Sequence, residues 1–447
     1  MTQIVTDSAN YPAPESTALS EHEWEARLMK IAADPRMSEE NTTISSASVR
    51  KFAYPMLFAG LVGLVVTVVG WFSVGSTHAL AAFEVGLFTA LAISLGSMFW
   101  VMVFHSLNAS WSITLRRQFE NLASVIWFPA LLLVAVALIE IFSGGILLRW
   151  INPGDEYNHL LEVKRPYLNP GFFMFRVVIY ASAWIAISQL LLFWSKRSDE
   201  TGDRRLGRYA RFASGFAIPI FALTCAFAAF DFLMSLDYRF FSTMWGVYYF
   251  ASCGLASVSA IAVVAFLLRH RAGKLDGLVT SEHFHDLGKL VFAFTVFWAY
   301  ISFSQYFLIW YSNIPEETAW FYNRQAHGYQ WLFIVMIAGH FILPFLLLIW
   351  RGTKRNMKLL TIMGLYMIFM VVMDMVWIIR PMVDFAASAS AEAGSASGIT
   401  TIWLDIAGVV CVLGFYAGIA ALKVAKSPLL PIKDPMLHES MKHKNYV

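Results

Sequence analysis

Ten apolar segments, each long enough to cross a membrane, divide the chain. A hydrocarbon core of about 30 Å needs roughly 20 helical residues. Within each segment apolar side chains occur on every side of a helix and do not alternate as they would in the strands of a β-barrel. The pattern predicts an all-α polytopic membrane protein with about ten transmembrane helices. They cover residues 52–72, 79–104, 121–142, 171–194, 211–234, 243–268, 286–311, 327–350, 358–380 and 401–423.

Polar tails flank these helices. The first 50 residues are rich in Ser, Glu and Thr and contain no apolar run typical of a signal peptide, so we expect a partly disordered tail. Lys and Arg are enriched in cytoplasmic loops of membrane proteins. With the N-terminus inside, the inner segments hold 25 of these residues and the outer loops hold six. Both termini are therefore predicted to lie in the cytoplasm.

Helices 2 to 5 and helices 6 to 9 resemble two copies of one unit. The segment after the third helix reads WINPGDE, the segment after the seventh reads WYSNIPEE, and the last helix of each unit carries an aspartate near its outer end, Asp231 and Asp374. Two four-helix bundles flanked by helices 1 and 10 are expected. The expected organisation is a tail over 1–50, helix 1 and a loop over 51–78, bundles over 79–240 and 241–385, a loop and helix 10 over 386–424, and a cytoplasmic tail over 425–447.

Composition excludes several classes of function. Of the 447 residues 58% are hydrophobic and 14% are charged, and the net charge of +3 is too small to indicate a nucleic-acid partner. The three cysteines are far apart, which excludes a disulfide framework, an iron–sulfur cluster and a CxxCH haem attachment. Phosphate-binding loops and H-E-x-x-H are absent. We expect the chain to hold no metal and no cofactor of its own.

Five carboxylic acids lie within the predicted helices, toward their outer ends. An ionisable side chain that faces lipid near the bilayer centre costs at least about 2.5 kcal/mol, so such groups usually face the protein interior. One interpretation is a set of proton-accepting sites connected to the outer face. The other is that the acids reach the interface or bond Arg149, Arg239 and Arg380. The five acids are Glu84, Glu140, Asp231, Asp374 and Asp405.

The seventh predicted helix carries a stripe of polar side chains on one face. Their spacings of ten, three, four and three residues keep them aligned. Such a stripe either holds a water chain that conducts protons or bonds neighbouring helices, the latter contributing about 0.6 kcal/mol for each bond. Asp286 and Lys289 at the cytoplasmic mouth favour the proton path. The stripe consists of His285, Thr295, Trp298, Ser302 and Gln305.

His340 is the only histidine deep inside a predicted helix. A haem b held by two histidines needs a second deep partner, and none exists, so a dihaem cytochrome b is excluded. We interpret His340 as a hydrogen-bonded residue of the second bundle and include it among the candidates for the proton path.

Two long stretches carry a resemblance to a known family. The first, residues 285–318, reads HDLGKLVFAFTVFWAYISFSQYFLIWYSNIPEET, and the second, residues 230–248, includes FDFLMSLD and FSTMWGVY. Both closely resemble the ActF membrane subunits of alternative complex III, a bacterial quinol:cytochrome c oxidoreductase, within the wider NrfD/polysulfide-reductase membrane family. The resemblance covers roughly residues 50–425.

The resemblance implies a cofactor-free subunit of an electron-transfer complex in the bacterial inner membrane. Its implied partners are a second NrfD-like membrane subunit, an iron–sulfur or molybdopterin-like subunit and a multihaem cytochrome c. Those partners carry the iron–sulfur clusters and haem c on the outer face, and the membrane subunits handle protons and bind quinol.

Two other functions are compatible with the sequence. Repeats and buried charges are also found in secondary transporters, although Pro219 and Pro344 occupy different positions in the two units, unlike the paired discontinuous helices of such proteins. A scaffold without catalytic function that anchors peripheral redox subunits is the third hypothesis.

Overall fold

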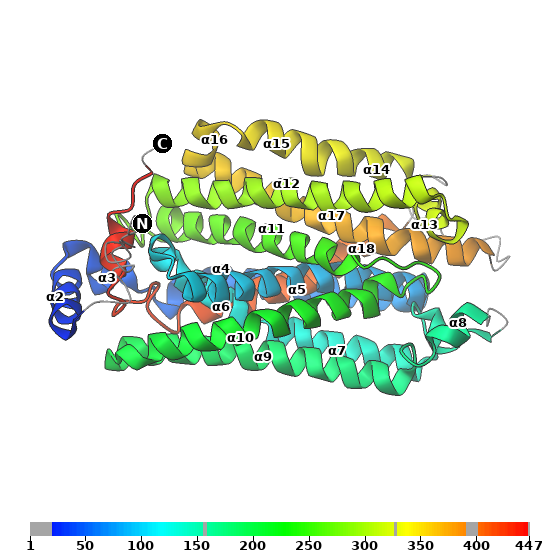
Figure 1. The fold of residues 1–447 in the computed structure, drawn as a ribbon, viewed down its shortest axis with the longest axis horizontal. Helices are drawn as coiled ribbons and strands as arrows, with labels where there is room; N and C mark the ends of the chain where they lie inside the picture. The colour runs from blue at the N-terminus through cyan, green and yellow to red at the C-terminus, as the bar shows by residue number, and fades with distance from the viewer. Residues whose placement is uncertain (1–19, 155–158, 326–328, 390–400, 446–447) are drawn as a thin grey trace, which may run out of the picture.

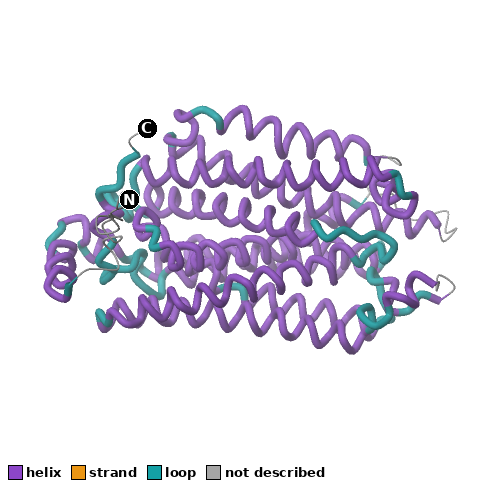
Figure 2. The backbone as a smooth tube through the Cα atoms, in the orientation of Figure 1, coloured by secondary structure: helices purple, strands orange, loops and turns teal. Residues whose placement is uncertain are grey.

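The fold is known from a computed structural model that describes residues 20–154, 159–325, 329–389 and 401–445. Throughout these ranges all regular secondary structure is helical and no strand occurs (Figure 2). Ten helical spans in them are long and apolar enough to cross a membrane. The expected all-α, multi-pass fold is confirmed. The spans contain α4 (Ser46–Ser73), α5 (Ser76–Leu107), α6 (Ile113–Ser124) with α7 (Trp127–Phe142), α9 (Pro170–Thr201), α10 (Arg204–Ala229), α11 (Trp245–Phe266), α12 (Ser281–Ser312), α14 (Gln330–Val335) with α15 (Leu343–Leu348), α17 (Met357–Ala389) and α18 (Ile402–Val424).

Three of these spans include a wider π-helical turn, and shorter helices occupy their ends. The π-helical segments are η5 (Phe230–Met234), η6 (Leu267–Arg271) and η7 (Met336–Ile342). The shorter helices are α2 (Glu21–Ala32), η1 (Pro35–Met37), α3 (Glu39–Thr42), η2 (Ser110–Ser112), η3 (Arg149–Ile151), α8 (His159–Lys164), α13 (Pro315–Gln325), α16 (Arg351–Arg355) and α19 (Leu437–Met441).

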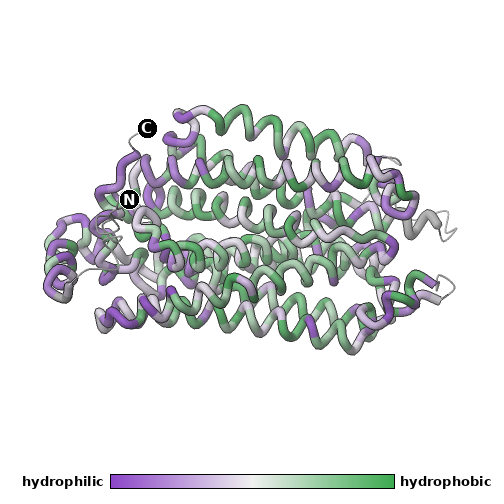
Figure 3. Tube along the Cα trace, in the orientation of Figure 1, coloured by the Kyte–Doolittle hydropathy of each residue, from purple (hydrophilic) through white to green (hydrophobic). Residues whose placement is uncertain are grey.

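The two ends of the helical array differ. Helices α2 and α3 and the final described segment of the chain lie at one end, which we call the terminal end, and α8 and α13 lie at the opposite, distal end (Figure 1). Hydrophilic residues gather at both ends, whereas the helices between them are mainly hydrophobic (Figure 3). This distribution is the one expected for helices whose middle parts lie in a bilayer.

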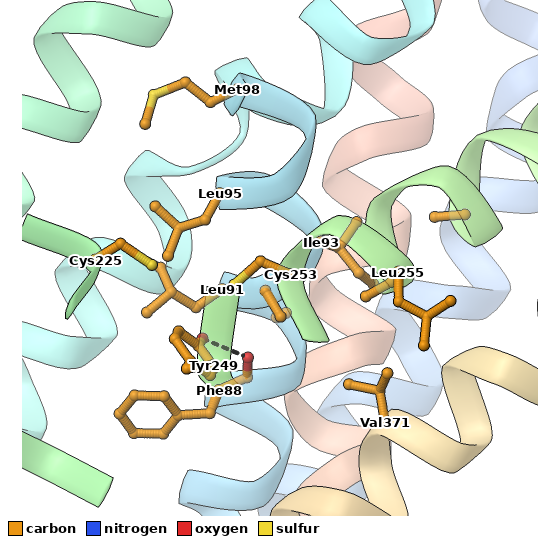
Figure 4. Close-up of a cluster of buried hydrophobic side chains, with 14 of the residues drawn as sticks. Phe88, Leu91, Ile93, Leu95, Met98, Cys225, Tyr249, Cys253, Leu255 and Val371 are labelled. Carbon is orange, nitrogen blue, oxygen red and sulfur yellow. Dashed lines mark hydrogen bonds between the residues drawn. The ribbon is translucent and has the colours of Figure 1, made fainter. Parts of the chain in front are cut away.

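Helix α5 forms the centre of the protein. In its most apolar window 89% of the residues are buried inside the protein, compared with 22% for α4. α5 contacts α18, α11, α10 and α17, so it packs against helices of both expected units, residues 79–240 and 241–385, which we call the first and second group of helices. Figure 4 shows part of this core, where the Tyr249 hydroxyl of α11 donates to the Phe88 carbonyl oxygen of α5 at 2.9 Å.

Helices α4 and α18 pack against each other, backbone to backbone. A Cβ added at Gly63 would lie 2.5 Å from the Cys411 nitrogen, and one added at Gly414 would lie 2.7 Å from the Gly60 nitrogen. Gly414 and Gly418 are four residues apart, which is the spacing of small residues at close helix crossings in membranes. The first and last membrane helices therefore pack closely against each other, because these glycines have no side chain to keep the two backbones apart.

The two tails form helices that their composition did not predict. Residues 20–45 contain α2 and α3, and α4 begins at Ser46, before the expected boundary at residue 51. The tails also contact each other: the Leu429 nitrogen donates to the Thr42 carbonyl oxygen at 2.8 Å, and Arg27 pairs with Glu439 at 2.6 Å. Residues 1–19 of the expected tail lie outside the described residues.

Arg324 at the distal end compensates for a proline in α17. Pro381 has no N–H, so the Trp377 carbonyl oxygen loses its intrahelical donor. Arg324 Nε donates to that oxygen at 3.0 Å, and Arg324 Nη2 donates to the Ile378 oxygen at 2.6 Å. The guanidinium also stacks on Trp320, 3.3 Å from the ring centroid. Burial lowers the pKa of Arg324, and these bonds offset part of that cost.

Candidate functional site

Asp374 is the centre of a buried polar cluster in the second group of helices. Its carboxylate is fully buried and accepts hydrogen bonds from the Tyr248 hydroxyl, from Ser252 Oγ at 3.0 Å and from Trp298 Nε1 at 3.2 Å. Tyr248 and Ser252 belong to α11 and Trp298 to α12, so three helices meet at this group. Among the described residues, no cation pairs with Asp374.

Asp374 lies in the distal half of its membrane span. The apolar span covers Met357–Val383, so Asp374 lies 17 residues from its first residue and nine from its last. Trp298 lies 17 residues after Ser281, the first residue of α12. The cluster is therefore inside the membrane-spanning part of the protein, where an ionised group is costly.

His340 lies beside this cluster. Its ring stacks on Trp298 with centroids 3.8 Å apart and an interplanar angle of 24°. The side chain is fully buried, and neither ring nitrogen has a hydrogen-bond partner among the described residues. His340 lies within the π-helical segment η7, a local widening often found at functional sites.

Two further candidates of the predicted α12 stripe extend the cluster toward the distal end. Ser302 and Gln305 follow Trp298 by four and seven residues and therefore share its face of α12. Ser302 Oγ and Gln305 Oε1 are buried and have no partner in the described part of the chain. Together with the two ring nitrogens of His340 they give four buried polar atoms that have no hydrogen-bond partner in the described ranges.

A second polar stripe, on α11, was missed in the sequence. Tyr248, Ser252 and Ser259 are spaced by four and seven residues, which places them on one face. Ser259 Oγ is buried and has no partner among the described residues. The signal that could have revealed the stripe is this spacing of hydroxyl groups in an otherwise apolar helix. The stripe leads from Asp374 toward the terminal end.

Asp231, the expected counterpart of Asp374, has a different environment. Its oxygens accept from Arg176 Nε at 2.8 Å and Arg176 Nη2 at 2.7 Å, and from the Tyr180 hydroxyl at 2.8 Å. Arg176 also donates to the Tyr167 carbonyl oxygen at 2.9 Å. Asp231 and Arg176 are both buried, so this is a neutralised, two-pronged ion pair that joins α9 to η5.

Glu84 and Glu140 are two buried acids in the first group of helices, on α5 and α7. Glu140 accepts from the backbone nitrogen of Leu147 at 3.0 Å and from that of Leu148 at 3.2 Å, so it fixes the loop after α7. Glu84 is buried, and neither of its oxygens has a hydrogen-bond partner among the described residues. Glu84 and Glu140 are thus, like Asp374, buried acids with no cation partner among the described residues.

The candidates at the start of α12 are covered by the final segment of the chain. Asp286 pairs with Lys289 and with His443 Nε2, the latter at 2.5 Å. Asn445 Oδ1 accepts from Lys289 Nζ at 2.9 Å. His285 is buried, and its Nδ1 has no partner among the described residues. Residues 443–445 therefore lie over the terminal end of the predicted stripe.

The stripe is interrupted between its two ends. Twelve residues separate Asp286 from Trp298, which is about 18 Å along a helix. Thr295 is the predicted candidate between them, and its hydroxyl donates to the Val291 carbonyl oxygen of its own helix at 2.8 Å. Thr295 and Ser259 are thus the polar groups available on α12 and α11 between the terminal end and the central cluster.

Asp405 forms an ion pair with an arginine, which is one of the two interpretations of the acids within the helices. Arg380 Nε donates to Asp405 Oδ1 at 2.6 Å, and Arg380 Nη1 lies 3.0 Å from His78 Nδ1. This is the pairing with Arg380 that the sequence suggested for an acid near a helix end. Asp405 and Asp231 are both neutralised by arginine, which distinguishes them from Asp374 and Glu84.

The described residues contain no group of three or more His, Cys, Asp and Glu side chains that could hold a metal ion. No family model matches the chain, and no curated protein matches it. The function is therefore inferred from the polar cluster around Asp374 and from the sequence itself.

Proposed function

We propose that the chain is an ActF-type membrane subunit of a quinol:cytochrome c oxidoreductase and that it contributes to proton translocation through the membrane. The family assignment rests on the resemblance of residues 230–248 and 285–318. The proton role rests on Asp374. In this proposal the terminal end faces the cytoplasm, in agreement with the distribution of Lys and Arg.

The observation that carries the proton role is that Asp374 has hydrogen-bond donors but, within the described part of the chain, no cation. Burying a charge without a counter-ion is costly, whereas a carboxyl group that gains and loses a proton avoids the lasting cost. Asp231, neutralised by Arg176, lacks this property. Asp374 is therefore the group that we assign to reversible proton binding.

The unsatisfied polar atoms around Asp374 suggest how protons reach it. Ser302, Gln305 and His340 each present a buried atom without a partner among the described residues, and Ser259 does so on the terminal side. Buried polar groups are normally hydrogen-bonded, and internal water supplies the bonds that protein groups do not. We expect water at Ser259, between Asp374 and His285 with Asp286 at the terminal end, and at Ser302 and Gln305 on the distal side of Asp374.

In the same proposal Glu84 accepts protons near the distal face. Oxidation of a quinol releases two protons, and a buried acid near the face where the electrons leave is suited to accept one. Glu84 and Glu140 lie near the distal ends of α5 and α7. Quinol itself binds in this proposal either to this chain or to the second NrfD-like subunit, and the haem c and iron–sulfur clusters belong to the partners.

Purification tests the assignment to a complex. The chain, carrying a C-terminal tag, is extracted in a mild detergent, its partners are identified by mass spectrometry, and quinol-dependent reduction of cytochrome c is measured. We expect multihaem cytochrome c and iron–sulfur partners together with activity. Recovery of an intact chain alone and without activity would contradict the assignment and favour a transporter.

The variant Asp374→Asn tests the proton role within the assembled complex. An amide cannot bind and release a proton, so we expect proton translocation into vesicles to fall at least tenfold per electron transferred. The matched control is Asp276→Asn, which removes one acid from an exposed loop at the terminal end. Unchanged translocation in Asp374→Asn would leave the chain as a scaffold for the redox subunits.

A further inference from the structure

A cavity of about 430 Å³ lies at the terminal end, apart from the proposed proton path. It is bounded by the ends of α5, α9 and α10, by α2 and by residues 431–436. These elements surround the site where membrane helices meet the polar tails, as seen at the terminal end in Figure 3. A ligand in this cavity would lie at the level of the lipid headgroups.

The cavity is rich in cationic groups. Arg116, Arg204, Arg208, Arg211 and Lys433 line it, together with three aspartates. Two of the aspartates are paired, since Asp434 bonds Arg116 at 2.8 Å and Asp199 bonds Arg117 outside the cavity lining. The third, Asp203, accepts from the Arg205 nitrogen at the start of α10. The remaining positive charge favours an anionic ligand.

Two buried donor atoms on the cavity lining have no partner. His105 is 9% exposed, and its Nε2 makes no hydrogen bond among the described residues. Arg211 bonds Asn108 through Nη2, but its Nε is buried and has no partner there either. Arg208 makes no ion pair with any described residue and is exposed. A ligand with several acceptor oxygens would satisfy these groups together.

The cavity adjoins a lipid-facing surface. Tyr209, Phe212 and Phe216 follow one another at spacings of three and four residues on α10, and Phe212 is 71% exposed. Arg208 and Arg211, on the adjacent side of the same helix, line the cavity. The Trp194 ring on the cavity lining packs near Tyr209, with centroids 6.3 Å apart. An acyl chain along this aromatic surface would hold its headgroup at the cavity.

We propose that this cavity binds the phosphate group of an anionic glycerophospholipid. Arg208 and Arg211 contact the phosphate, His105 Nε2 donates to it from the buried side, and the acyl chains lie along Tyr209, Phe212 and Phe216. This proposal is independent of the proton role of Asp374. Basic pockets between helices on the cytoplasmic side of membranes suit such headgroups.

Native mass spectrometry of the full chain, or of the complex in which it is purified, tests the proposal. The protein is titrated in detergent with phosphatidylglycerol, phosphatidylcholine or inorganic phosphate. We expect preferential binding of phosphatidylglycerol, weakened about fivefold by Arg208→Gln and by a similar factor by Arg211→Gln. The matched control is Arg205→Gln, because Arg205 lies on the same helix but does not line the cavity.

Several results of this titration would overturn the lipid proposal. Equal binding of phosphatidylcholine, or equal affinities of Arg208→Gln and the wild-type chain, would overturn the proposal. Inorganic phosphate that displaces phosphatidylglycerol at millimolar concentration would show that the site takes a free anion and would overturn the lipid assignment. If Arg211→Gln does not fold, Arg208→Gln still decides the matter because Arg208 is exposed.

Discussion

Breaking the ion pair between Arg176 and Asp231 should destabilise the protein strongly. Arg176→Met leaves the Asp231 carboxylate buried, and the Tyr180 hydroxyl at 2.8 Å is then its one remaining side-chain donor among the described residues. Removing one partner of a buried pair costs about 3–5 kcal/mol, because the remaining charge is uncompensated. Asp231→Leu should cost a similar amount, since it leaves the guanidinium unpaired.

The double variant Arg176→Met with Asp231→Leu tests whether the loss of stability in each single variant comes from the charge that is left unpaired. Replacing a buried ion pair by apolar side chains of similar volume is often neutral, so we expect the double variant to lie within about 2 kcal/mol of the wild-type chain. The two single effects should therefore not add. The free energy of unfolding is measured in mixed detergent micelles by titration with dodecyl sulfate.

Asp374→Asn is the matched comparison, because it removes the buried carboxylate that has no cation. An asparagine oxygen in the place of Oδ2 still accepts from Ser252 and Trp298, and its amide group donates to the Tyr248 oxygen. We expect a loss below about 1 kcal/mol. Wild-type stability in Arg176→Met, or a loss in Asp374→Asn as large as in Arg176→Met, would refute the distinction between the two aspartates.

Three further predictions concern the fold. Gly414→Ile should destabilise the α4–α18 pair by about 1–3 kcal/mol through overpacking, whereas Gly215→Ile, with open space at its Cβ, should have little effect in the same unfolding assay. Arg324→Met should cost about 1–3 kcal/mol for each carbonyl group left without a donor, and Pro381→Ala should restore part of the loss by returning an N–H. Deleting residues 442–447 should speed hydrogen exchange in the first turns of α12 at least tenfold, as measured by mass spectrometry, because His443 and Asn445 bond Asp286 and Glu282 at that end.

The sequence predicted the membrane helices well because their length and apolarity are set locally. A span must be about 20 residues long and almost free of charge, and both properties can be read along one segment. The helix ends were predicted less well. α12 begins at Ser281, five residues before the apolar run, because its cap at Thr280 and its polar first turn extend beyond the bilayer-spanning part.

The environments of the candidate acids could not be predicted in this way. The partner of Asp231 is 55 positions away in the chain, on another helix, so the pair depends on how α9 and η5 pack. The stacking of His340 on Trp298 likewise depends on the packing of two helices. Spacing within one helix identifies a polar face, but it does not show whether a cation lies opposite.

Asp231 and Asp374 differ in the partners that their carboxylates bind. Asp231 and Asp374 belong to the last helix of each expected unit, yet one is fixed by Arg176 and the other is held by three hydrogen-bond donors. A paired aspartate stabilises helix packing, whereas an unpaired one costs stability unless it can be protonated. Arg176 on α9 therefore makes Asp231 a group that stabilises helix packing, whereas no equivalent cation lies among the described residues around Asp374, and the proposed proton role of Asp374 rests on this difference.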